Sequence, residues 1–302
     1  MPENKLSKLW YKIFNKNKYR DLKDAQRTIE NLKYYNQHIY SQILDIQKKI
    51  ENKKELSFLH SGQMGDIIYS LASIKELSKT HKCKLYIQTN KPMTSDFSNS
   101  SRKFLLDQRC AKLFLPLLKF QNFIQEVNIY NNNEIDINLD LFRDIPINRS
   151  FYSSRWFSHI CGININIEEA FLLAKPHQTI KGKIIVGRSP RYRNVFLNYK
   201  FLAETNNLLC IGLEEEFIDL KKDIKNLEFY NCKDFLEMAE IIMASKFYIG
   251  NMSLQYIMAE GLKIPRLLEA SPDFPVSFPV GKKAFDAYHQ NHFEKYFFNL
   301  NK

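Results

Sequence analysis

The apolar residues of the first fifty positions recur at helical spacing. Residues 5–54 contain neither Gly nor Pro. Their apolar positions follow one another in steps of three and four: Leu6, Leu9, Trp10, Ile13 and Phe14, then Ile29, Leu32, Tyr35, Ile39, Ile43 and Ile46. This spacing predicts helices with one apolar face. For residues 26–54 we expect a helical hairpin arm or a short coiled coil.

From residue 56 onward, short apolar runs alternate with helical patterns, which predicts βαβ units and parallel sheets. In a first series the predicted strands are 56–60, 83–89, 127–130 and 135–141, and the helices 66–80, 103–120 and 152–161. In a second series the predicted strands are 183–186, 208–211, 227–230, 247–249 and 265–269, and the helices 234–244 and 253–262.

The fold class that follows is α/β, with two Rossmann-like lobes and a helical extension. A chain of 302 residues favours two folded units over one. We expect a basic helical extension over 1–54, an N-terminal lobe over 55–180 and a C-terminal lobe over 181–302. A ligand is expected at the carboxyl ends of the strands, where the two lobes face each other.

The positive charge is concentrated at the N-terminus. Residues 1–54 hold 13 Lys/Arg and 6 Asp/Glu, which is +7 of the net +11. The first helix carries Lys5, Lys8, Lys12, Lys16 and Lys18 beside its apolar face. Such a helix can lie in an anionic membrane surface, or pack on the protein or on a partner helix. Nucleic acid is the least favoured partner, because no aromatic platform or binding motif accompanies the lysines.

Composition narrows the location of the protein. No apolar run approaches the roughly 20 residues that span a membrane, and the N-terminus lacks the apolar stretch of a secretory signal. Five cysteines are scattered singly, as expected of buried thiols in a reducing compartment. We expect a cytoplasmic protein, or one held at the inner face of a membrane by its surface.

Glycines gather at the ends of predicted strands. Of only nine in the chain, five follow such strands: Gly62, Gly65, Gly187, Gly212 and Gly250. They predict backbone that turns sharply or approaches a ligand closely, and tight βα turns alone would require the same residues.

The first candidate site is the turn from Ser61 to Asp66, between a strand and a helix. Backbone N–H groups at a helix start attract anions, so Gly62 and Gly65 would line a site for phosphate or a developing oxyanion. Asp66 could accept a proton from an acceptor hydroxyl, or serve only as an acidic residue in the first turn of a helix.

The same segment carries a family resemblance. A strand, then Gly-x-x-Gly-Asp-Ile-Ile-x-x-Leu, then a helix resembles the opening of the heptosyltransferases, GT-B glycosyltransferases of lipopolysaccharide synthesis. The resemblance extends over roughly residues 56–270, weakly through 135–140 and more clearly in the second lobe. It implies that Asp66 is the base of an inverting, metal-independent transfer. The sugar would pass from a nucleotide-diphosphate donor to a glycan or glycolipid, with no cofactor.

The second candidate is the loop from Gly187 to Asn194, which follows the first strand of the second lobe. Its three arginines could clamp a diphosphate, because guanidinium groups match phosphate oxygens. We expect Arg188 and Arg191 to bind donor phosphates and Arg193 to face solvent. A plain solvated basic loop is the alternative.

The third candidate is the strand, turn and helix from Phe247 to Leu262. In GT-B proteins this element seats the donor nucleotide, which implies that role for Gly250, Asn251 and Ser253. The last two are also good helix N-caps. Glu260 resembles the carboxylate that many GT-B proteins place near the donor ribose.

The chain departs from the heptosyltransferase pattern at two positions. Met252 and Ile257 stand where that family commonly carries an Asp and a His. A broader heptosyltransferase-like family of undefined sugar specificity is therefore expected. The departure also favours a second hypothesis, a binding protein on the same fold that holds a nucleotide without chemistry. No metal is expected, because no Asp-x-Asp ends a convincing strand and no calcium loop is complete.

Overall fold

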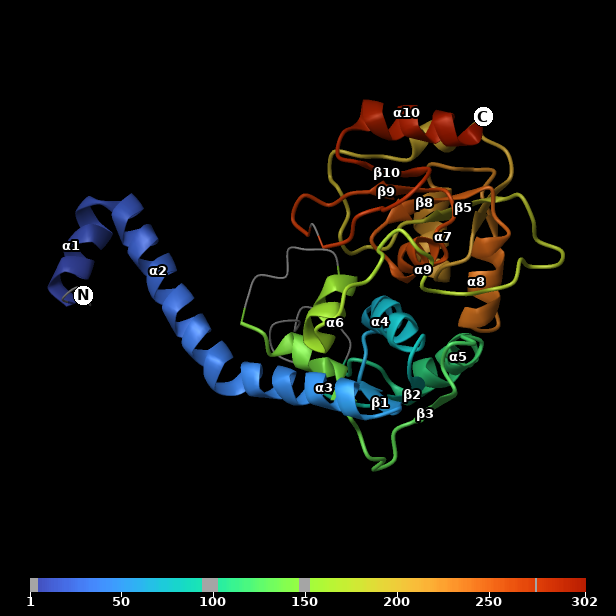
Figure 1. The fold of residues 1–302 in the computed structure, drawn as a ribbon. Helices are drawn as coiled ribbons and strands as arrows, with labels where there is room; N and C mark the ends of the chain where they lie inside the picture. Colours follow the sequence, from blue (N-terminus) through green and yellow to red (C-terminus); the bar gives the residue numbers. More distant parts are fainter. Residues whose placement is uncertain (1–4, 94–102, 147–152, 275) are drawn as a thin grey trace.

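The protein combines two parallel β-sheets with surrounding helices and a projecting N-terminal arm (Figure 1). This computed structural model describes residues 5–93, 103–146, 153–274 and 276–302. Every neighbouring pair of strands in the two sheets is parallel. The predicted α/β class with two parallel sheets is confirmed.

The first sheet has the strand order β3-β2-β1-β4. Its strands are β1 (Glu55–His60), β2 (Lys82–Ile87), β3 (Glu126–Ile129) and β4 (Ile137–Asn138). The chain therefore moves outward from β1 to β3 and then returns to the other side of β1. The last predicted strand is shorter than expected, because residues 139–143 form a 3-10 helix.

The second sheet has the order β10-β9-β8-β5-β6-β7, which is the strand order of the Rossmann fold. Its strands are β5 (Ile184–Gly187), β6 (Leu208–Cys210), β7 (Glu228–Phe229), β8 (Phe247–Asn251), β9 (Arg266–Glu269) and β10 (Ala284–Ala287). Every residue of β5, β6, β8 and β9 is buried. Burial on both faces explains why these strands read as continuous apolar runs.

The helices of the body are α4 (Met64–Leu77), α5 (Gln108–Lys119), α6 (Ser154–Cys161), α7 (Glu214–Lys221), α8 (Phe235–Met243), α9 (Leu254–Leu262) and α10 (Gln290–Asn301). α5 starts later than predicted, because the side chain of Asp107 caps it. Residue 152, where we expected another helix to begin, lies outside the described residues. We did not predict α7, β10 or α10, whose sequences lack a long apolar run.

Helices of the two halves pack against each other. α4 contacts α9 and α5 contacts α8, and one continuous apolar core includes residues from both halves. The hydroxyl of Tyr69 on α4 lies 3.0 Å from the hydroxyl of Ser277, which follows β9. The junction between the halves is thus a packed interface centred on α4 and α9.

Of the two arrangements we expected for residues 26–54, a helical hairpin arm or a short coiled coil, the hairpin is wrong, because the helices there follow one another in a continuous run. The N-terminal helices are α1 (Lys5–Phe14), α2 (Lys16–Tyr34) and α3 (Tyr40–Asn52), with one π-helical turn between the last two. No Gly or Pro occurs in this stretch to close a tight turn between α2 and α3.

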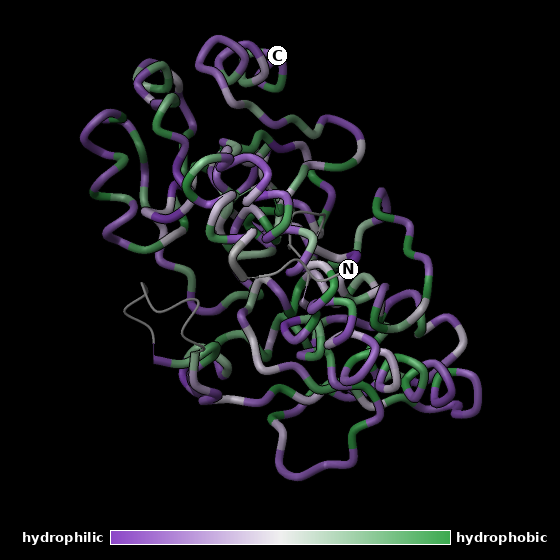
Figure 2. The backbone as a smooth tube through the Cα atoms, turned by 90° about the vertical axis from the view of Figure 1, so that its left-hand side faces the viewer, coloured by the Kyte–Doolittle hydropathy of each residue, from purple (hydrophilic) through white to green (hydrophobic). Residues whose placement is uncertain are grey.

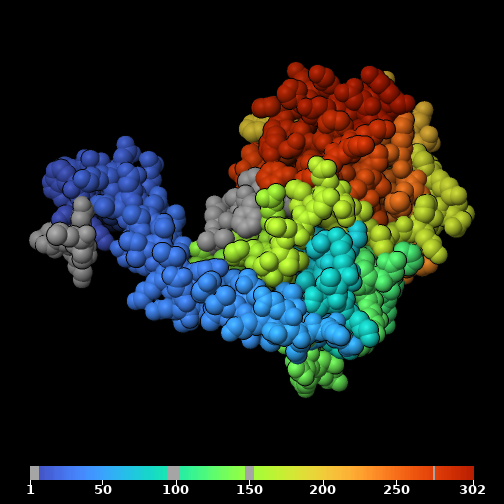
Figure 3. Space-filling model, viewed as in Figure 1, coloured from blue at the N-terminus to red at the C-terminus, as the bar shows by residue number. Residues whose placement is uncertain are grey.

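The extension divides into two parts. The π-helical turn buries Ile39 in the core, and α3 buries Ile43 and Ile46 there and contacts α6, so this part packs with the first half. α2 buries no residue. The space-filling view shows α1 and most of α2 standing clear of the body (Figure 3).

Candidate functional site

In both sheets the direction of strand succession reverses next to the first strand. The reversal lies between β1 and β4 in the first sheet and between β5 and β8 in the second. Loops that follow two such neighbouring strands diverge to opposite faces and leave room for a ligand at the carboxyl edge. The candidate residues follow three of these strands, β1, β5 and β8.

Asp66 lies in the first turn of α4, directly after β1. Its Oδ2 accepts hydrogen bonds from Nη2 of Arg143 at 3.0 Å and from the backbone N–H of Gln63 at 3.3 Å. Among the described residues none donates to Oδ1, and the side chain is 34% exposed. One carboxylate oxygen is therefore anchored while the other is available to a ligand.

Behind Asp66 lies a second, buried carboxylate that follows β4. Asp140 accepts from Nη1 of Arg143 at 2.5 Å, from Nζ of Lys91 at 2.9 Å and from the backbone N–H of Ser61 at 3.1 Å. Burial opposes ionisation of Asp140, but His60, Arg143, Ser61 and Lys91 outweigh it and set its pKa below the usual range. Arg143 thus links the two carboxylates.

His60, the last residue of β1, lies against this cluster. Its Nδ1 accepts from the backbone N–H of Gly62 at 3.1 Å, which assigns the ring proton to Nε2. Burial lowers the pKa of His60 to about 4, so the ring is neutral at neutral pH. The positive charge that balances Asp140 therefore comes from Arg143 and Lys91.

Gly62 and Gly65 make close packing possible around this turn. Gly62 has a φ of +103°, and a Cβ there would lie 2.9 Å from Cβ of Leu106. A Cβ at Gly65 would lie 2.5 Å from Cδ1 of Ile257 on α9. The start of α4 therefore meets the first turns of α9.

In the second sheet, Asn251 holds the loop that follows β5. It is fully buried, its Oδ1 accepts from the backbone N–H of Ser189, and its Nδ2 donates to the carbonyl oxygens of Ser189 and Arg191. Ser253 caps α9 and accepts from the backbone N–H of Tyr256 at 3.4 Å. Asn251 thus fixes the loop that follows β5, and Ser253 fixes the start of α9, both at the carboxyl edge of the sheet.

The three arginines of this loop differ in their surroundings. Nε and Nη2 of Arg188 donate to the carboxylate of the fully buried Glu269, at 2.8 and 2.9 Å. Arg193 pairs with Asp219 at 2.7 Å, so it does not simply face solvent as we expected. Arg191 is exposed and forms no ion pair with any described residue. Of the three, Arg191 is the guanidinium available to a phosphate.

The glycines of the second sheet accommodate polar side chains. A Cβ at Gly187 would lie 2.3 Å from Oε1 of Gln255, and one at Gly212 would lie 2.3 Å from Oε2 of Glu216. A Cβ at Gly250 would meet the hydroxyl of Tyr248 at 2.3 Å. At Gly250 the backbone carbonyl oxygen of Gly187 lies closer still, at 2.1 Å. All these close approaches are to atoms of the protein itself, which corresponds to the tight-packing alternative for the glycine pattern.

Glu260 lies in the last turn of α9, at the far end of the helix from Ser253. It is fully buried, and its carboxylate pairs with Arg266, also fully buried, and with Lys263. The role near a ribose that we predicted for Glu260 stays a prediction. We leave the residue out of the proposed site, because its carboxylate already binds two cations.

Sequence reasoning missed several members of this edge: His60, Lys91, Asp140, Arg143 and Glu216. Burial raises the pKa of Glu216, whose carboxylate accepts from the backbone N–H of Leu213 at 3.2 Å. A signal was present for two of them, since Asp140 and Arg143 follow β4 as Asp66 follows β1.

A pocket of about 470 Å³ lies at the opposite, amino-terminal end of the first sheet, away from Asp66. Its lining residues are Lys53, Lys54, Glu55, Leu56, Ser57, Lys84, Tyr86, Asn133, Glu134 and Asp136. Lys53 and Lys84 there are paired with carboxylates. Because it lies at the amino-terminal end of the strands, the pocket is separate from the carboxyl edge that carries the candidate site.

Over 5–93, 103–146, 153–274 and 276–302, no group of three or more His, Cys, Asp or Glu is arranged to hold a metal ion. Within the same ranges, no helix is both long and apolar enough to cross a membrane.

Comparison with known proteins shows a likeness in fold and none in sequence. No protein-family model matches the chain, and no curated protein matches it in sequence. A glycosyl transferase family 9 structure from Veillonella parvula has a TM-score of 0.53 at 9% identity, over 78% of this chain and 86% of that one. Escherichia coli heptosyltransferase WaaC, solved with ADP-2-deoxy-2-fluoro heptose, has a TM-score of 0.47 at 10% identity, over 82% of this chain and 100% of its own.

The fold is thus that of a family 9 glycosyltransferase, and at this identity the likeness concerns the fold alone. The resemblance to heptosyltransferase-like proteins that the sequence suggested is confirmed at that level.

Proposed function

We propose that the protein is an inverting, metal-independent glycosyltransferase of the GT-B type. Residues 55–180 would form the acceptor lobe and residues 181–302 the donor lobe. The observation that carries the proposal is the contact of Gly65 with Ile257, which brings the turn bearing Asp66 against α9. In this arrangement the place where the strand order reverses in one sheet would face the corresponding place in the other sheet. A ligand that binds between two lobes needs its two binding edges to face each other in this way.

Asp66 would act as the general base. Its anchored Oδ2 fixes the carboxylate, and Oδ1 would take the proton of an acceptor hydroxyl. The acceptor oxygen then attacks the anomeric carbon as the bond to the nucleoside diphosphate breaks. The configuration inverts because attack and departure occur on opposite faces.

The leaving diphosphate would be stabilised by Arg191 and by the start of α9. Arg191 has no carboxylate partner among the described residues, and the first turn of a helix presents backbone N–H groups to an anion. Arg188 and Asn251 would position this loop through Glu269 and Ser189 without touching the phosphates themselves. This narrows the predicted donor site to Arg191 and the turn at Gly250 and Ser253.

A second candidate function is nucleotide binding without chemistry. Met252 and Ile257 occupy positions where heptosyltransferases commonly carry an Asp and a His, and Ile257 is used in packing against Gly65. A protein of this kind would recruit a ligand or partner on the same fold.

A panel of nucleotide sugars separates these functions. The full chain is heated with UDP-, GDP-, ADP- and CMP-sugars, and any that raises its melting temperature is incubated with it while free nucleotide is measured. Release of nucleoside diphosphate from a UDP-, GDP- or ADP-sugar that is insensitive to chelator supports the transferase, whereas release of CMP from a CMP-sugar would contradict the proposed diphosphate donor. Binding without release favours the second candidate, and no binding by any member contradicts both.

A further inference from the structure

The first helix exposes a cluster of large apolar side chains. Relative exposures are 55% for Leu9, 55% for Trp10, 59% for Ile13 and 70% for Phe14. The rings of Trp10 and Phe14 lie 5.5 Å apart, so they form one patch. The contact of α1 with α2 leaves this patch uncovered. Contiguous exposed apolar surface on a soluble protein marks an interaction site.

Every charged residue around the patch is basic. Residues 5–20 contain Lys5, Lys8, Lys12, Lys16, Lys18 and Arg20 and no Asp or Glu. The ion pairs formed by described residues include none of these cations, and the ammonium of Lys18 lies 4.9 Å from the ring centre of Tyr11. The surface therefore offers an apolar strip beside an uncompensated positive strip.

We propose that α1 binds the surface of a bilayer that contains anionic phospholipids, with Trp10, Ile13 and Phe14 inserted at the headgroup level. Aromatic rings favour this interface, and phosphate headgroups supply the negative charge with which no described residue pairs Lys8 and Lys12. A helix of ten residues is too short to span a bilayer, so α1 lies parallel to its surface.

Charge argues for lipid over a second copy of the chain. Two apolar strips in contact would bring two sets of six cations together with no acidic residue of 5–20 between them. A protein helix that paired with α1 would need an acidic flank, which neither α1 nor the first turn of α2 supplies.

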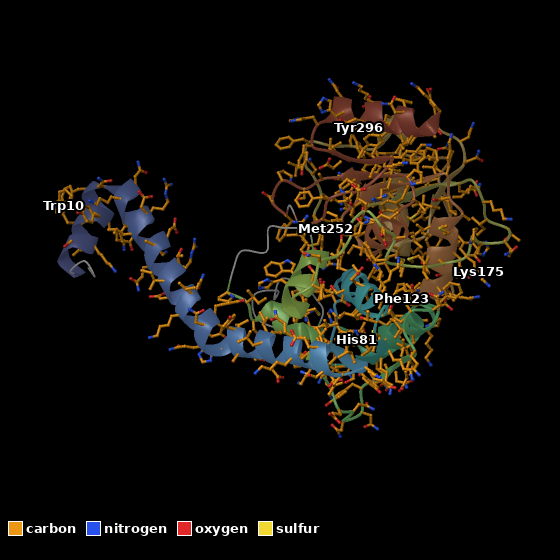
Figure 4. All side chains as sticks on the ribbon, in the orientation of Figure 1. Trp10, His81, Phe123, Lys175, Met252 and Tyr296 are labelled. Carbon is orange, nitrogen blue, oxygen red and sulfur yellow. The ribbon has the colours of Figure 1, made fainter. Side chains whose placement is uncertain are left out.

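The position of the arm relates membrane binding by α1 to the candidate site. In Figure 1, α1 stands off from the body at the height of the junction between the two halves, and in Figure 2, viewed from the side of the arm, the N-terminus lies in front of the middle of the body. Figure 4 shows Met252, which follows β8, on the side of the body nearer to Trp10, with Lys175 on the far side. If the proposed transferase function holds, a bound α1 would keep the donor edge near a glycolipid acceptor. The binding itself does not depend on that function.

The test uses the full chain and vesicles without nucleotide sugar. One set is pure phosphatidylcholine and the other contains about 30% phosphatidylglycerol, a fraction that gives a negative surface. Trp10 is exposed and Trp156, the other tryptophan, is buried at 3% exposure, so a blue shift of the emission reports insertion of Trp10. Cosedimentation measures the partition coefficient.

We expect binding to the anionic vesicles with a blue shift, and at least about tenfold weaker binding to the neutral ones. The variants Ile13→Ser/Phe14→Ser and Lys8→Glu/Lys12→Glu should each lose at least about tenfold in partition. Phe298→Ser and Lys295→Glu, exposed residues of α10, are the matched controls and should bind as the unmodified chain does.

Three results would overturn the proposal: no partition into anionic vesicles, equal partition of the α1 variants, or equal binding to neutral lipid. Self-association in buffer that is abolished by Ile13→Ser/Phe14→Ser would also contradict it, since the strip would then cover a second copy. Failure of nucleotide-sugar turnover leaves this test unaffected, because no sugar donor enters it.

Discussion

Nη2 of Arg143 lies 3.0 Å from Oδ2 of Asp66, and this ion pair connects two segments 77 residues apart. The same guanidinium reaches the buried Asp140 through Nη1. A carboxylate in the core thereby fixes the arginine, and the arginine fixes the carboxylate at the edge. Asp66 is oriented by residues that follow a different strand.

Arg143→Gln tests this positioning. Glutamine keeps a polar side chain but loses the positive charge that pairs with both Asp66 and Asp140. The carboxylate of Asp66 should therefore rotate away from the acceptor. We expect turnover to fall roughly 10-fold to 100-fold while donor affinity stays unchanged. Arg155→Gln, an exposed arginine of α6, is the control and should behave as the unmodified chain. Equal losses in donor affinity and turnover would assign Arg143 a structural role alone.

The local pattern of the sequence predicted most strands but not their partners. Phe247 to Ile249 reads as a buried strand because both of its faces are covered, whereas Leu56 to His60 alternates between buried and half-buried residues. The juxtaposition of Asp66 with Arg143 depends on β4 pairing with β1, which strand periodicity does not encode. In the same way, Arg188 and Arg191 look equivalent in sequence, and only a carboxylate 81 residues away from Arg188 distinguishes them.

The glycines after the strands do lie where the backbone is approached closely, as the sequence predicts. The sequence does not identify the atoms that approach them. Gly65 and Gly250 do mark close approaches, and the nearest atoms belong to the side chain of Ile257 and to the backbone carbonyl of Gly187. Sequence spacing shows that a Cβ is disfavoured at such a position. It does not show whether the space belongs to a ligand or to other atoms of the protein, because Ile257 and Gly187 come from distant segments of the chain.

A double-mutant cycle tests the contact between the two halves. A Cβ at Gly65 meets only Cδ1 of Ile257 closely, and the next atom, Cγ1, is 3.9 Å away. Gly65→Ala should lower the free energy of unfolding by about 1 to 2 kcal/mol through this overlap. In an Ile257→Val background, which lacks Cδ1, the loss should disappear, because alanine also favours the helix.

Chemical denaturation of the unmodified chain, the two single variants and the double variant gives the coupling free energy between Gly65→Ala and Ile257→Val, which we expect to be about 1 kcal/mol or more. Ile241→Val removes the same methyl group from a buried residue elsewhere and should not rescue Gly65→Ala. Additive effects of Gly65→Ala and Ile257→Val would mean that the two helices do not meet at these positions.

Substitution of Arg188 should lower the stability of the fold, whereas substitution of Arg191 should lower the affinity for nucleoside diphosphate. Arg188→Gln leaves the fully buried Glu269 without its cation, so it should destabilise the fold by about 3 kcal/mol or more. Arg191→Gln should leave the melting temperature unchanged and weaken nucleoside diphosphate binding by roughly 10-fold. Calorimetric titration and thermal unfolding of both variants make the comparison. Normal diphosphate affinity in Arg191→Gln would remove Arg191 from the donor site.

His60 makes stability depend on pH. An unfolded histidine has a pKa of about 6.5, whereas the buried ring titrates at about 4. Between these values the unfolded chain binds a proton that the folded chain does not, so stability falls as the pH drops through this window. The contribution between about pH 7 and about pH 5 is roughly 2 kcal/mol.

In His60→Asn, Oδ1 can replace Nδ1 as the acceptor for Gly62 N–H, and the group no longer titrates. The loss of unfolding free energy between the two pH values should shrink by that amount. His292→Asn, an exposed histidine on α10, should retain the full pH dependence. An unchanged pH slope in His60→Asn would show that the ring is not held neutral in the fold.

Asp66→Asn tests the central claim most directly. The amide keeps the shape of the side chain and its place in the first turn of α4 but cannot accept the proton of a hydroxyl. With the nucleotide sugar identified by the binding panel, donor affinity and transfer rate are measured for both proteins. The account predicts unchanged donor affinity and a transfer rate lower by about 100-fold to 10,000-fold. Transfer at the rate of the unmodified chain would contradict it.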